Sequence, residues 1–263
     1  MAISFVDIHC HLLPGIDDGA RDWDESMAMA QLAVADGTTT IIATPHQLGN
    51  FGGNRSDTVR GLVAELQQRL DAVNVPLKIL AGADVRIEPD LAEKIHCGDV
   101  LSLGDHRRHV LLELPHELYL PMEPVLDDLA RRNMVGILSH PERNQGIQRD
   151  PNLLVPLVDR GCLTQVTAGS LCGSFGGECQ RLAEWMLSER LVHFVATDAH
   201  GPRARRPLML RAYQRVVELT DEETAADLCL QNPSCVAAGC EVRPGRRPSP
   251  IRGNRWWTRR TIA

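Results

Sequence analysis

Short apolar runs rich in β-branched residues recur along the chain, and each ends in a cluster of polar residues. Segments with helical spacing of apolar positions lie between them. Strands that alternate with helices predict βαβ units and a parallel sheet. Seven such strand–helix units in about 200 residues predict an α/β fold, namely a (β/α) barrel with seven strands. The alternative is an open doubly wound sheet. The runs span residues 5–11, 38–46, 77–85, 109–116, 134–142, 162–170 and 192–200.

Four of the intervening segments predict amphipathic helices. The first has acidic residues in its first turn and Gly37 at the position expected of a helix C-cap. The four segments span residues 23–37, 55–73, 121–133 and 178–190.

The composition changes near residue 240. Residues 241–263 carry seven arginines and three prolines with little apolar periodicity. Such a segment cannot bury enough surface to offset its ordering entropy. We therefore expect one barrel domain over residues 1–240 and a basic, disordered tail over 241–263. The alternative for this tail is binding to an acidic partner or an anionic surface.

Charge and composition exclude several classes of protein. A net charge of −6 argues against nucleic acid as the main partner of the barrel. No segment approaches the roughly 18 apolar residues of a membrane span, and the N-terminus lacks the features of a signal peptide. The eight cysteines form no C-x-x-C pair. We expect a reduced, cytoplasmic protein, with oligomerisation left open.

Histidines and carboxylates follow six of the seven predicted strands. The C-terminal ends of the strands form the active-site face of such barrels. Buried groups of this kind are costly unless paired, and a shared cation satisfies them together. Only the sixth run, ending in TAGS, lacks a residue of metal-ligand type. In chain order the residues are His9, His11, His46, Asp84, Glu113, His140, Asp198 and His200.

The first and last strands carry matching pairs. His9 and His11 are two residues apart and point to one face of a strand, as Asp198 and His200 do on the last strand. In a closed barrel these strands are neighbours, so the pairs would lie side by side. Nitrogen and carboxylate ligands suit Zn, Mn or Fe. The set exceeds what one ion uses, so we expect two or three divalent ions.

Clustered divalent ions and arginines favour phosphoester hydrolysis, because the ions stabilise both the attacking and the leaving oxygen. Arg143 in SHPERN could bind a phosphate with two donors. So could Arg203, Arg205 or Arg206 in HGPRARRP.

Other chemistries fit less well. The spacing of Cys240 and Arg246 matches the C-x5-R phosphate loop of cysteine phosphatases, but no strand precedes it. An amidohydrolase with a bridging carbamylated lysine would need a lysine at the C-terminal end of a strand. Lys78 begins its predicted strand and Lys94 lies in a helical segment, so neither fits. The remaining histidines have ordinary structural explanations. His106 and His109 are expected in an exposed turn before the fourth strand. His116, just beyond Glu113, is the borderline case for a role in the site.

The motifs DIHCH, DDG, ATPH, GAD, LLELP, SHPER and ATDAH resemble the polymerase-and-histidinol-phosphatase (PHP) superfamily over residues 4–238. The similarity is greatest to its bacterial manganese-dependent protein-tyrosine phosphatases of capsular and exopolysaccharide clusters. This resemblance implies a distorted, TIM-like (β/α)7 barrel with a trinuclear site, commonly of Mn, with Zn, Fe or Co as alternatives. It also implies a metal-bridging hydroxide as nucleophile and, as substrate, the phosphotyrosine-containing tail of a bacterial tyrosine kinase.

The resemblance assigns roles residue by residue. Asp17 is expected to shape the turn beside Asp18. Asp84 stands where the family has Glu, one methylene longer, so a bridge there must shift or one ion be held less tightly. The implied metal ligands are His9, His11, Asp18, His46, Glu113, His140, Asp198 and His200, with Asp84 at the departing position. The implied phosphate contacts are Arg143 and Arg205 or Arg206.

Two alternatives share this fold. One is hydrolysis of histidinol phosphate or another small phosphomonoester. The other is a degenerate, non-catalytic barrel that regulates or binds a kinase, suggested by Asp84 and the basic tail.

Overall fold

The computed structural model describes residues 3–242, so the predicted tail beyond Val242, with Arg246, lies outside the described residues. Every predicted strand region forms a strand, and two are split into consecutive pieces. The second region gives β2 (Thr38–Ala43) and β3 (His46–Gln47), and the third gives β4 (Lys78–Ala81) and β5 (Asp84–Arg86). The other strands are β1 (Phe5–Cys10), β6 (His109–Glu113), β7 (Val135–Ser139), β8 (Leu163–Thr167) and β9 (Phe194–Ala196).

All strand pairs are parallel, in the orders β1-β2-β4 and β3-β5-β6-β7-β8-β9. The two sheets are continuous through the split strands. Ala43 pairs with Ala81, and His46 pairs with Asp84, so the same register resumes after the interruption. Pro45, which has no N–H group to donate, lies within the break. Seven strands therefore follow one another around the molecule.

The first and last strands meet at a seam. The main-chain N–H of Asp198 donates to the carbonyl of His9 (2.7 Å), and that of His11 donates to the carbonyl of Ala199 (2.9 Å). A parallel bridge joins Cys10 to Ala199. These contacts bring β1 beside β9, as expected for a barrel rather than an open sheet. The fold is a distorted (β/α)7 barrel.

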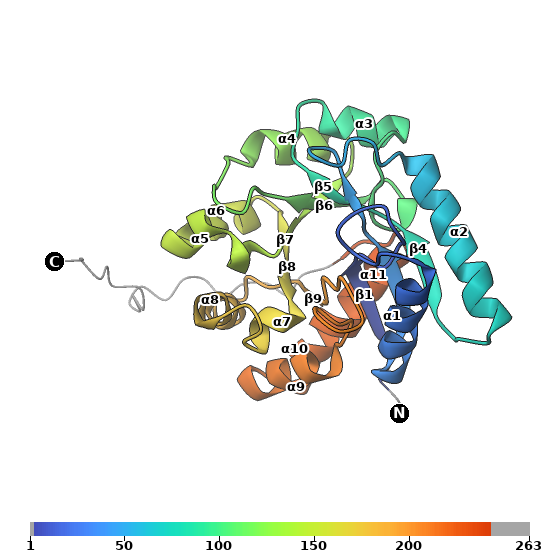
Figure 1. The fold of residues 1–263 in the computed structure, drawn as a ribbon. Helices are drawn as coiled ribbons and strands as arrows, with labels where there is room; N and C mark the ends of the chain where they lie inside the picture. The colour runs from blue at the N-terminus through green and yellow to red at the C-terminus, as the bar shows by residue number, and fades with distance from the viewer. Residues whose placement is uncertain (1–2, 243–263) are drawn as a thin grey trace.

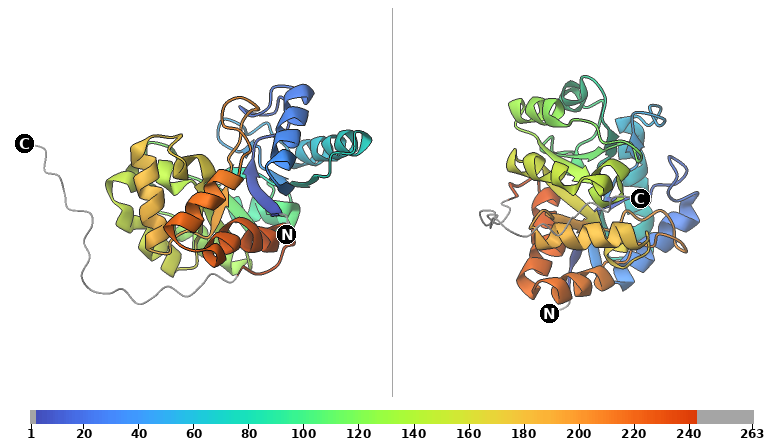
Figure 2. Two further views of the ribbon diagram at one scale, coloured as in Figure 1. Left: turned by 90° about the horizontal axis from the view of Figure 1, so that it is seen from below. Right: turned by 90° about the vertical axis from the view of Figure 1, so that its left-hand side faces the viewer.

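Helices surround the strands (Figures 1 and 2). The four predicted helices are confirmed, and Gly37, with φ of 102°, follows the end of α1. In chain order the helices are α1 (Trp23–Ala35), α2 (Ser56–Ala72), α3 (Leu91–Cys97), α4 (Glu123–Arg131), α5 (Gln145–Arg149), α6 (Leu154–Asp159), α7 (Ala168–Leu171), α8 (Gly177–Ser188), α9 (Leu210–Leu219), α10 (Glu222–Ala226) and α11 (Asn232–Ala237). None of the helices in residues 3–242 is both long and apolar enough to cross a membrane.

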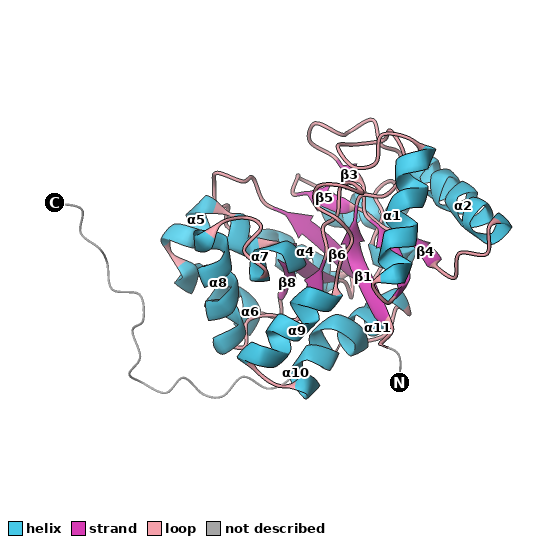
Figure 3. Ribbon diagram, turned by 60° about the horizontal axis from the view of Figure 1, so that its bottom comes forward, coloured by secondary structure: helices cyan, strands magenta, loops and turns pink. Residues whose placement is uncertain are grey.

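The apolar core has two parts. A large cluster includes Phe5, Met29 and Leu70 and packs the helices onto the outside of the strands. A smaller cluster fills the barrel with strand residues such as Ile8 and Phe194. Helix α11 packs against β1 and contributes Val236 to this inner cluster (Figure 3). Apolar residues therefore fill much of the barrel interior.

Candidate metal centre

The nine residues expected to bind metal lie together at the C-terminal ends of the strands. They form four overlapping groups in which the possible ligand atoms lie within 4.8 Å of one another. The groups are His11, Asp18, His46 and His200; His9, His11 and Asp84; His9, His140 and Asp198; and His46, Asp84 and Glu113.

The seam between β1 and β9 brings His9, His11 and Asp198 together. Oδ1 of Asp198 lies 3.2 Å from Nε2 of His9 and 3.4 Å from Nε2 of His11. The two Nε2 atoms are 3.1 Å apart. All three side chains are buried, so the seam concentrates polar atoms that water cannot reach.

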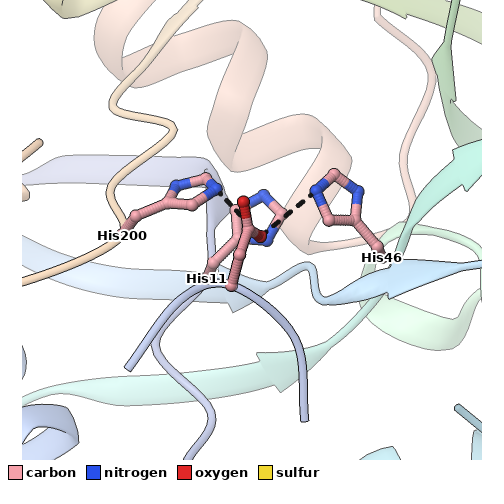
Figure 4. Close-up of side chains that lie close together, drawn as sticks. His11, His46 and His200 are labelled. Carbon is pink, nitrogen blue, oxygen red and sulfur yellow. Dashed lines mark ion pairs between the residues drawn. The ribbon is translucent and has the colours of Figure 1, made fainter. Parts of the chain in front are cut away.

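A second cluster lies beside the first, toward the solvent. His11, His46 and His200 face one another (Figure 4), and the rings of His11 and His200 have centroids 4.0 Å apart. Oδ1 of Asp18 lies 3.4 Å from Nε2 of His200 and 3.5 Å from Nε2 of His46. These two histidines hold the pKa of Asp18 far below its usual range. Asp18 thus presents a charged oxygen to two imidazoles.

Asp84 is the clearest indication that the cluster could hold a cation. It is fully buried, and neither carboxylate oxygen has a hydrogen-bond partner in the described residues. Burial, and then the charge of Glu113, raise the pKa of Asp84 well above its usual value. A buried carboxylate without hydrogen bonds is costly, and a bound cation is a common way to offset that cost.

The spacing around Asp84 also fits a divalent ion. Its Oδ2 lies 3.5 Å from Nδ1 of His46, 3.6 Å from Nε2 of His9 and 4.0 Å from Nε2 of His140. Atoms bound tetrahedrally to one ion at about 2.1 Å lie about 3.4 Å apart. The imidazole and carboxylate donors therefore fit Zn, Mn or Fe. The longest of these three distances is the one to His140.

Two of the site residues adopt a backbone conformation that is uncommon outside glycine. His140 has φ of 32° and Asp198 has φ of 49°. Both follow the end of a strand, where the left-handed conformation turns the chain sharply. Such strain costs about 1–3 kcal/mol per residue and persists where the surrounding structure fixes it.

Sequence reasoning missed the partner of His9. Oε1 of Gln165 lies 2.8 Å from Nδ1 of His9. Such a contact fixes the ring orientation of an imidazole whose other nitrogen binds metal. Gln165 comes from the middle of β8, whereas the predicted ligands follow the ends of strands. A polar residue inside the buried strand LTQVT was the available signal.

Asp17 shapes the turn, as expected, and has a second contact that we did not predict. Its carboxylate accepts from the N–H of Gly19 (2.9 Å) and lies 2.8 Å from Nδ1 of His11. Burial opposes protonation of His11, but its contacts with Asp17 and Asp198 outweigh it and raise the pKa to about 9. Burial instead lowers the pKa of His9 to about 3. The two neighbouring imidazoles thus have opposite electrostatic surroundings.

Two of the expected arginines reach the cluster. Arg143 and Arg205 both donate to Oδ2 of Asp198, the oxygen opposite the one that faces the histidines. Arg206 is exposed, and no hydrogen bond or ion pair joins its side chain to the described part of the cluster. Arg203 pairs with Glu25 at 3.6 Å. Of the alternatives Arg205 and Arg206, the structure brings Arg205 to the site.

The other histidines lie outside the four groups. The prediction that His109 lies in an exposed turn is wrong. His109 is buried and is the first residue of β6. The strand begins there because Val110 to Leu112 continue an apolar run that pairs with β7. His116 is exposed.

Comparison with known proteins agrees with this architecture. The family model for capsular polysaccharide synthesis proteins CpsB/CapC matches residues 5–238. Tyrosine-protein phosphatase YwqE of Bacillus subtilis is 38% identical over 202 residues, which are 76% of this chain and 79% of that protein. A putative tyrosine-protein phosphatase CapC of Staphylococcus aureus is 32% identical over 207 residues, 78% of this chain and 80% of that protein.

A solved structure from the work on YwqE of Bacillus subtilis and CpsB of Streptococcus pneumoniae, described as metal-dependent tyrosine phosphatases, superposes with a TM-score of 0.85. The two chains are 32% identical in sequence, and the superposition covers 93% of this chain and 100% of the solved one. The family-model match covers residues 5–238 of this chain, which contain every strand and all nine clustered residues. The chain belongs to the CpsB/CapC family of capsular polysaccharide synthesis proteins.

Proposed function

We propose that this protein is a metal-dependent phosphatase that removes phosphate from phosphotyrosine in proteins. The observation that carries the proposal is the buried Asp84 carboxylate, which has no hydrogen-bond partner among residues 3–242 and lies among His9, His46 and His140. The relatives described as tyrosine phosphatases, and as metal-dependent, support it.

Two or three divalent ions fit the donor set. Three of the four groups contain a residue that no other group uses: Asp18 and His200 in one, His140 and Asp198 in another, and Glu113 in a third. This supports one ion in each, Mn first on the resemblance, with Zn, Fe or Co as alternatives. Bound divalent ions would activate a water molecule and neutralise the phosphate oxygens.

The protein's own residues would bind and orient the phosphate. Arg143 and Arg205 each use a single donor on Asp198, and guanidinium groups offer up to five donors in a planar fork. Arg205 Nε is buried and without a partner in the described residues. The oxygens of a phosphate beside Asp198 would accept hydrogen bonds from these free donors. The tyrosyl oxygen needs little help to leave, because the pKa of a phenol is only about 10.

The finer assignments concern the partner and the compartment. Membership of a capsular polysaccharide synthesis family supports the phosphorylated tail of a bacterial tyrosine kinase as substrate. A kinase tail of this kind would meet the enzyme in the cytoplasm.

The test compares hydrolysis of p-nitrophenyl phosphate and a phosphotyrosine peptide before and after chelation, with Mn, Zn or Co added back. We expect EDTA to abolish both activities and one ion to restore them. His140→Ala should abolish activity, whereas His116→Ala, which changes an exposed histidine outside the four groups, should not. Activity that survives His140→Ala would overturn the assigned site.

Two outcomes would replace the proposal with an alternative. Faster turnover of histidinol phosphate than of phosphotyrosine peptides would indicate a small-molecule phosphatase. Fewer than two tightly bound ions per chain, together with no hydrolysis, would indicate a regulatory barrel.

A further inference from the structure

The loop between α7 and α8 brings an aromatic ring against both arginines of the site. The guanidinium carbon of Arg143 lies 4.5 Å from the centroid of the Phe175 ring, and that of Arg205 lies 5.7 Å away. A guanidinium within about 6 Å of an aromatic centroid is attracted by the negative face of the ring. Phe175 therefore contacts both guanidinium groups. It follows β8, the strand that is not followed by a residue of a type that binds metal.

The two arginines need such support because they converge. Both donate to Oδ2 of Asp198, so two positive charges approach one oxygen. The other oxygen of Asp198 faces His9 and His11. Asp198 thus fixes one end of each guanidinium, and the Phe175 ring is the second fixed contact that they share.

The backbone of the loop fixes the ring in turn. Gly173 and Gly176 have φ of 81° and 89°, and the N–H of Ser174 donates to the carbonyl of Gly169 (2.8 Å). A Cβ atom at Gly169 would lie 2.8 Å from Cε2 of Phe175, closer than real contacts allow. The ring therefore packs directly on the Gly169 main chain. Its position depends on a glycine in α7 as well as on the loop.

We propose that Phe175 is a positioning residue for phosphate binding. Its ring and Asp198 together hold Arg143 and Arg205 with their remaining donors free. Ordering these flexible side chains before phosphate arrives reduces the entropy lost on binding. The inference rests on the proposed function, since it presumes that the two arginines bind phosphate.

The experiment measures hydrolysis of p-nitrophenyl phosphate and its inhibition by inorganic phosphate, in the metal-loaded full chain. Phe175→Leu keeps an apolar side chain but removes the aromatic face. We expect KM and the phosphate inhibition constant to rise about three- to tenfold, with kcat changed less than about twofold. Phe175→Tyr keeps the ring and should restore both constants to within about twofold of the original protein.

Two controls separate positioning from a purely structural role. Ser174→Ala changes an exposed neighbour in the same loop and should leave both constants unchanged. In an Arg143→Ala, Arg205→Ala background, Phe175→Leu should not raise the phosphate inhibition constant further, because the groups it positions are gone. Bound metal and the thermal midpoint should be the same in Phe175→Leu as in the original protein.

The outcomes are distinguishable. An unmodified protein that hydrolyses no phosphomonoester would refute the proposed function itself. An active protein whose phosphate inhibition constant is unaffected by Phe175→Leu refutes the positioning role alone. Equal losses in Phe175→Leu and Phe175→Tyr, or full additivity with the arginine substitutions, also refute it.

Discussion

Replacing Asp84 by asparagine should change stability in opposite directions with and without divalent metal. Asp84 is fully buried and its two carboxylate oxygens have no hydrogen-bond partner in the described residues. A buried group left in this state costs about 1–3 kcal/mol, and more when it is charged. Asparagine keeps the size of the side chain and removes the charge. In the absence of metal, Asp84→Asn should therefore stabilise the protein.

The size of the effect follows from these values. A gain of about 1–2 kcal/mol in a protein of this size raises the thermal midpoint by about 2–8 °C in EDTA. An ion present at 100 times its dissociation constant adds about 2.7 kcal/mol to the unmodified protein. The variant would lose most of that contribution, because a charged ligand is gone. The order of the two midpoints should reverse when metal is added.

The pH dependence has a definite sign. Burial raises the pKa of Asp84 in the folded protein, so the protonated carboxyl stabilises the folded state. That contribution is complete below the unfolded pKa of about 3.9 and is lost as pH rises toward the folded pKa. In EDTA, the advantage of Asp84→Asn over the original protein should therefore grow as the pH is raised from about 4.

The assay is thermal unfolding of both proteins, in EDTA and in excess Mn, at two pH values. Asp7→Asn is the matched control. Asp7 is also buried, but its carboxylate accepts from the N–H of Thr197 (3.0 Å) and of His9 (3.2 Å). Its substitution should shift the midpoint equally in EDTA and in metal. If Asp84→Asn lowers the midpoint in EDTA, the carboxylate is not a cost in the absence of metal, and the reasoning fails.

Two further predictions concern the neighbours of the cluster. Gln165→Leu removes the contact to Nδ1 of His9 and should lower metal affinity about 10- to 100-fold, measured by metal titration. Gln165→Glu keeps an acceptor and should retain more of the affinity. Asp17→Ala removes the partner of His11 and should lower metal affinity similarly. Unchanged affinity in either Gln165→Leu or Asp17→Ala would show that ring orientation does not limit binding.

The chain pattern alone predicted much of this protein. Alternating strand and helix periodicities gave the seven strands, because a parallel barrel repeats one unit whose apolar positions are fixed by its two packing faces. The candidate ligands were also predictable. A polar residue directly after a buried strand reaches the C-terminal rim, wherever that strand lies in the sequence.

Only the tertiary structure decided which residues support the ligands. Gln165 lies 156 positions from His9 along the chain, and Phe175 contacts arginines from two other loops. Local pattern cannot report such contacts, because they depend on how the strands are packed side by side. The choice of Arg205 over Arg206 is of the same kind, since one residue of difference in a loop decides which side chain meets Asp198. Sequence periodicity thus determined the barrel and its rim, whereas the packing of distant strands and loops determined how the rim residues are oriented.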